Sequence, residues 1–110
     1  MSVSSETYVI LGVNRIADYG ADSGWYERYE SIMFDPHTVK IGDRGLLFDG
    51  MNTDYALFGQ VLALGTEYDA MPLTQIKLAD LIAPTADVLE WLDSHKVSGK
   101  PDLFIVTHLH

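Results

Sequence analysis

Four short apolar runs, rich in residues that favour β-strands, impose the strongest limit on what this chain can fold into. They are residues 8–13 (YVILGV), 46–49 (LLFD), 55–64 (YALFGQVLAL) and 103–106 (LFIV). Runs of this length and composition predict strands. The chain contains no cysteine, so the packing of apolar side chains must hold these strands together without disulfides.

The second and third runs are separated by a turn-forming stretch. Gly50-Met51-Asn52 follows the second run directly, and this pattern predicts a hairpin. Both faces of residues 55–64 are largely apolar, which is typical of a central strand. Gly12 lies inside the first run, where a glycine indicates a bulge or the close approach of a neighbouring backbone.

Helices are predicted between the strands. A turn-rich loop over residues 18–24 precedes residues 25–33, whose apolar positions recur at helical spacing up to the stop at Pro36. Later, Pro72 predicts the start of a helix over residues 73–82. Thr85 is then placed to cap a second helix, with Gly99 beyond its end.

This order of elements predicts an α+β fold. We expect a two-layer sandwich with a mainly antiparallel sheet of four or more strands and two or three helices on one face. The helical segment before the last strand leaves parallel pairing of that strand open. With 110 residues, no repeat and no linker-like composition, residues 1–110 are expected to form a single domain.

Charge excludes several classes of partner. Sixteen acidic and seven basic side chains give a net charge of −9, which disfavours contacts with the phosphates of nucleic acids and with anionic membranes. No apolar stretch is long enough to span a bilayer. The first residues do not resemble a secretory signal, so a cytoplasmic location is expected.

The last predicted strand runs into two histidines, His108 and His110. Their spacing places both imidazoles on one face of a strand, where paired histidines can bind zinc or another transition metal. The stretch Thr107-His108-Leu109-His110 is similar to the start of the metallo-β-lactamase signature T-H-x-H-x-D-H, whose Asp-His half is absent here. The alternative is that these histidines only end a buried strand.

Aromatic and acidic side chains gather at two places in the sequence. The first group consists of Tyr19, Trp25, Tyr26, Glu27, Tyr29 and Glu30, and the second consists of Glu90 and Trp91. One interpretation is that the rings pack into the core, as aromatic residues at helical spacing usually do. The other is a contact surface for a protein partner, because Trp and Tyr are enriched at binding hot spots and acidic residues complement a basic surface.

Residues 46–63, LLFDGMNTDYALFGQVLA, resemble a segment of small tailed-phage proteins of unassigned function. The resemblance implies a phage-encoded accessory or inhibitor protein that acts on a host protein. The leading hypothesis is therefore a small, acidic, non-enzymatic protein-binding domain that uses no cofactor and engages a basic surface. One alternative is a small metal-assisted enzyme built on carboxylates and histidines, and another is a homo-oligomeric structural subunit.

Overall fold

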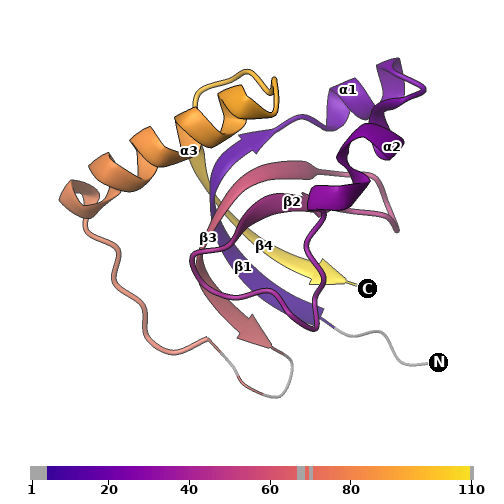
Figure 1. The fold of residues 1–110 in the computed structure, drawn as a ribbon. Coiled ribbons are helices and arrows are strands. Elements are labelled where there is room, and N and C mark those ends of the chain that lie inside the picture. Colours follow the sequence, from indigo (N-terminus) through magenta and orange to yellow (C-terminus); the bar gives the residue numbers. More distant parts are fainter. Residues whose placement is uncertain (1–4, 67–68, 70, 110) are drawn as a thin grey trace.

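A computed structural model describes residues 5–66, 69 and 71–109 (Figure 1). Strand β1 (Ser5–Asn14) is followed by helices α1 (Ile16–Ala21) and α2 (Trp25–Tyr29), and by the 3-10 turn η1 (Glu30–Ile32). The second half contains β2 (Arg44–Phe48), β3 (Ala56–Thr66), the 3-10 turn η2 (Leu78–Leu81), α3 (Ile82–Ser94) and β4 (Asp102–Leu109).

The four strands form one antiparallel sheet in the order β2-β3-β1-β4. The predicted hairpin is formed by β2 and β3, and β3 has the predicted central position. β4 pairs with β1 in the antiparallel direction, which decides against the parallel alternative. With helices packed on the sheet, the predicted α+β class is confirmed.

The two central strands approach each other closely at a pair of glycines. Gly12 of β1 lies opposite Gly59 of β3, and a Cβ atom added to Gly12 would clash with the backbone carbonyl of Phe58. The close approach predicted for Gly12 is therefore present. The register between the strands shifts at Val9/Ile10, a separate irregularity beside this contact.

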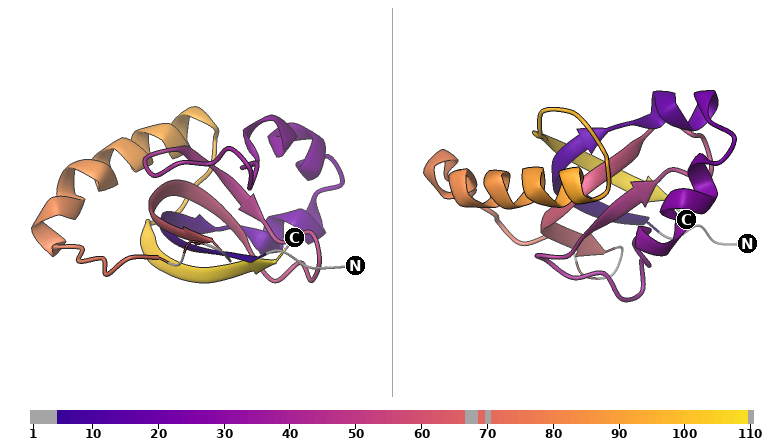
Figure 2. Two further views of the ribbon diagram at one scale, coloured as in Figure 1. Left: turned by 90° about the horizontal axis from the view of Figure 1, so that it is seen from below. Right: turned by 45° about the horizontal axis from the view of Figure 1, so that its top comes forward.

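Helices α2 and α3 cover the same face of the sheet (Figures 1 and 2). Trp25 and Tyr29 of α2 and Val88 and Leu92 of α3 are buried in one cluster with strand residues such as Phe58. The opposite face carries a second cluster, formed by Tyr8, Ile10, Leu47, Leu57 and Val61. Both faces of the central strands are therefore buried.

Three helical boundaries differ from the prediction. Residues 16–21 form the short helix α1, although part of this range was predicted to be a loop. The helix predicted over 73–82 is wrong, because the chain stays irregular until Leu78, and Leu73 is fully exposed instead of being buried on a helix face. Helix α3 begins at Ile82, so Pro84 lies in its first turn, where the missing proline N–H breaks no helical hydrogen bond.

Candidate functional site

His108 of β4 is a buried histidine within a polar cluster. Its Nδ1 atom lies 2.6 Å from the hydroxyl of Tyr55, and its ring makes edge contacts with the rings of Tyr8 and Tyr55. The other predicted metal ligand, His110, lies outside the described residues. Within the part of the chain that the structure describes, no group of three or more His, Asp or Glu side chains is arranged to hold a metal ion.

The two tyrosines beside His108 are held in their neutral form. Burial raises the pKa of Tyr8 to about 12, and the carboxylate of Glu6 acts in the same direction. Burial, together with the carboxylates of Asp49 and Asp54, also raises the pKa of Tyr55 to about 12. The hydroxyl of Tyr8 is buried and has no hydrogen-bond partner among the described residues.

Asp49 organises the turn between β2 and β3. Its carboxylate accepts hydrogen bonds from the backbone N–H groups of Met51, Asn52 and Asp54, at 3.2, 3.1 and 3.0 Å. Burial by itself raises the pKa of Asp49, but these three donors together hold that pKa below its usual value. The acidic residue of the DGMN stretch therefore has a structural role in the predicted turn.

The first predicted contact group is divided between the core and the surface. Trp25 and Tyr29 are buried, so their rings stabilise the core and are not available to a partner. Tyr19 and Tyr26 are 37% and 40% exposed, and both rings contact the ring of Phe48. Glu27 and Glu30 are exposed on the same segment.

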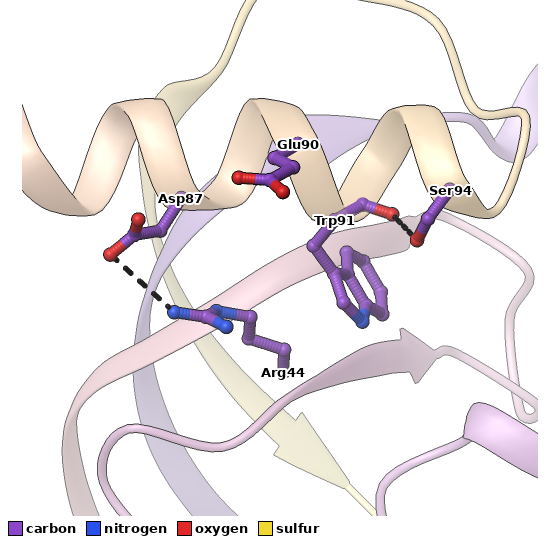
Figure 3. Close-up of a pocket in the computed structure, with 5 residues that line it drawn as sticks. All are labelled: Arg44, Asp87, Glu90, Trp91 and Ser94. Carbon is purple, nitrogen blue, oxygen red and sulfur yellow. Dashed lines mark hydrogen bonds and ion pairs between the residues drawn. The ribbon is translucent and has the colours of Figure 1, made fainter.

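The second predicted group, Glu90 and Trp91, lines an open groove of about 370 Å³ between α3 and strand β2. Figure 3 shows the indole of Trp91 descending from α3 towards the sheet and Arg44 rising from β2 towards Asp87. The Trp91 ring is half-buried, and its centroid lies 4.7 Å from that of the His95 ring. The groove thus combines an aromatic wall with charged groups.

Arg44 joins the two sides of the groove. Its Nε donates a hydrogen bond of 3.0 Å to the side-chain oxygen of Gln60, its cross-strand neighbour. One of its terminal nitrogens lies 3.7 Å from a carboxylate oxygen of Asp87, an exposed ion pair that contributes little stability. Glu90, by contrast, has no ion-pair or hydrogen-bond partner among the described residues, so the acidic side of the groove retains an uncompensated carboxylate.

Sequence reasoning missed Arg44 and Ser94 as groove residues. Asp87, Glu90, Trp91 and Ser94 are spaced by three, four and seven residues from the first, which places them on one face of a helix. That spacing is a signal that the sequence contains. Arg44 had no such signal, because its place depends on the packing of β2 beneath α3.

Comparisons of the chain with protein-family models, with curated proteins and with solved structures found no match. Across the described residues, no helix has both the length and the apolar character needed to cross a membrane.

Proposed function

We propose that the protein is a non-enzymatic binding domain whose acidic and aromatic groove receives a basic side chain of a protein partner. The observation that carries this proposal is the position of the uncompensated Glu90 carboxylate beside the half-buried Trp91 ring. A lysine or arginine side chain can lay its apolar stem on the indole and direct its charge to the carboxylate.

The net charge of −9 supports the same class of partner, because it accelerates encounter with a basic surface. Tyr19 and Tyr26 with Glu27 and Glu30 supply a second exposed contact region on the same side of the sheet. The resemblance of residues 46–63 to small tailed-phage proteins supports a host protein in the cytoplasm as the partner.

A short oligo-arginine peptide tests the groove directly by two-dimensional NMR of the ¹⁵N-labelled protein. We expect the indole N–H resonance of Trp91 to shift on titration, whereas that of the buried Trp25 serves as an internal reference. The affinity should fall steeply as salt is added, because exposed charges are screened over roughly 10 Å at 0.1 M ionic strength.

Two substitutions on α3 provide a matched comparison. Glu90→Gln should weaken peptide binding roughly three- to tenfold, an effect of about 1 kcal/mol. Asp93→Asn removes the same charge from the same helix but outside the groove, and it should leave the affinity nearly unchanged. Binding that is indifferent to salt and to Glu90→Gln would contradict the proposal. Affinity capture from the host would then identify the natural partner, whose association Glu90→Lys should slow.

A further inference from the structure

The two edge strands of the sheet differ in whether another segment of the chain pairs with their outer side. At the β2 edge, Met33 forms a bridge with Leu46, and the N–H of Phe34 donates a hydrogen bond of 2.9 Å to the Leu46 carbonyl. The other edge strand, β4, pairs on its inner side with β1, and no described segment pairs with its outer side. Figure 2 shows β4, in yellow, along the outside of the molecule.

β4 also lacks the features by which natural edge strands avoid pairing with another chain. Such strands usually carry charged side chains, a proline or a bulge. Over eight residues β4 has one charged side chain, Asp102 at its start, and it contains no proline. Its register with β1 is continuous from Asp102 to Leu109, so no bulge twists this edge away.

An uncovered apolar surface adjoins this open edge. Leu103, Ile105 and Leu109 project on the helix-covered face of the sheet, but α3 does not extend over them, and Ile105 is 78% exposed. Leu103 and Ile105 line an apolar groove of about 410 Å³ together with Met71, Pro72, Leu73 and Ile76. Backbone groups able to pair and an apolar face able to be covered thus lie on the same strand.

We infer that a second copy of this chain pairs with β4 in antiparallel fashion about a two-fold axis. Residues opposite each other in such a ladder share a face of the sheet, so the two paired residue numbers must sum to an even number. The register with Ile105 on the axis brings the most exposed apolar side chain of β4 against its own copy. It also places Leu103 opposite Thr107, and Phe104 opposite Val106.

Few charged side chains oppose the approach of a second copy at the β4 edge. Two molecules of net charge −9 repel each other, so they can meet only where carboxylates are sparse. In the register about Ile105, the two Asp102 side chains lie at opposite ends of the paired strands, opposite His108 of the other copy. A standard interface covers about 800 Å² of each partner, roughly a ninth of this surface of 6974 Å². A dimer paired through β4 must cover an area of that order, and Leu103, Ile105 and Leu109 supply exposed apolar surface for it.

Molar mass measured by light scattering and sedimentation equilibrium, over concentrations up to about 1 mM, tests the pairing. We expect a dimer, and Ile105→Lys should weaken it by at least about tenfold. Ile41→Lys is the matched control, because Ile41 is 65% exposed and lies just before β2, the edge strand at the other end of the sheet from β4. Circular dichroism spectra and melting curves of both variants verify that they fold.

Single cysteines test the register, because the chain has none of its own. Opposed residues in an antiparallel ladder have Cα atoms about 4.5–5.5 Å apart, within the range for a disulfide. Ile105→Cys should therefore form a covalent dimer under mild oxidation, whereas Leu103→Cys, displaced along the strand from its copy, should not. A monomer at every concentration overturns the inference. So does a dimer that survives Ile105→Lys, or one that Ile105→Cys fails to cross-link.

Discussion

Replacement of Tyr8 by phenylalanine should stabilise the protein. Tyr8 is 0% exposed, and its hydroxyl finds no hydrogen-bond partner among the described residues. An unsatisfied buried polar group costs about 1–3 kcal/mol, and Tyr8→Phe removes that group while it keeps the ring contact with His108. We expect the free energy of unfolding to rise by about 1 kcal/mol and the melting temperature by about 4–8 °C.

Alkaline pH provides a second measurement on the same hydroxyl. Because the folded-state pKa of Tyr8 is raised to about 12 from 10.0, the unfolded chain releases this proton first as the pH increases. Stability should therefore fall between about pH 10 and 12. The full shift corresponds to at most about 2.7 kcal/mol, and solvent screening reduces the expected loss to about 1–2 kcal/mol. Tyr8→Phe should lose less stability over this range.

Urea denaturation near neutral pH and at about pH 11 measures both effects. Tyr55→Phe is the informative contrast, because its hydroxyl lies 2.6 Å from Nδ1 of His108. Its removal leaves a buried imidazole nitrogen without that partner, so Tyr55→Phe should destabilise the protein by about 1–3 kcal/mol near neutral pH. If Tyr8→Phe also destabilises the protein, the hydroxyl has a stabilising interaction and the reasoning is refuted.

Two further predictions concern the backbone. Gly12→Ala should destabilise the protein by more than about 3 kcal/mol or prevent folding, because the new methyl group would clash with the β3 backbone. Gly20→Ala in α1 is the control and should be neutral or slightly stabilising, because its methyl group meets open space. If thermal melts show the same loss of stability for both variants, the close packing at Gly12 is contradicted. Asp49→Asn should cost about 1–3 kcal/mol near neutral pH. Because the folded-state pKa of Asp49 is lowered, its contribution is lost as the pH falls through that pKa. Urea midpoints of the wild type and the variant should therefore converge as the pH falls below that pKa, and a constant difference would refute this role.

Much of the sheet could be predicted because local patterns determine it. The apolar run of residues 55–64 already indicated a central strand, and the turn-forming stretch Gly50-Met51-Asn52 indicated the hairpin. The pairing of β4 with β1 could not be predicted in the same way. Most of the chain separates these two strands in sequence, and no pattern in either strand indicates which strand it pairs with.

Helices were less predictable because short helices depend on tertiary contacts. Residues 73–82 have apolar residues at plausible helical positions, but no facing surface buries Leu73 or Leu78. α1 forms in six residues without a side-chain cap, which leaves little signal in the sequence.

The candidate site shows the same division between local and distant information. The gathering of acidic and aromatic side chains in the sequence indicated Glu90 and Trp91, whereas the contribution of Arg44 arises from a strand remote in sequence. Trp25 and Tyr29 have the composition of a binding hot spot, but their rings point into the core. The sequence alone could not distinguish these two outcomes.

The cover that Met33 and Phe34 place on β2 limits how far the proposed pairing can propagate. Once two copies have joined through β4, both outermost strands of the shared sheet are β2 strands, each already occupied by a segment of its own chain. Further strand addition at β2 would then have to displace the segment that is bridged to Leu46. The protein can therefore have one edge strand that is open to pairing and still form a closed dimer instead of a fibre.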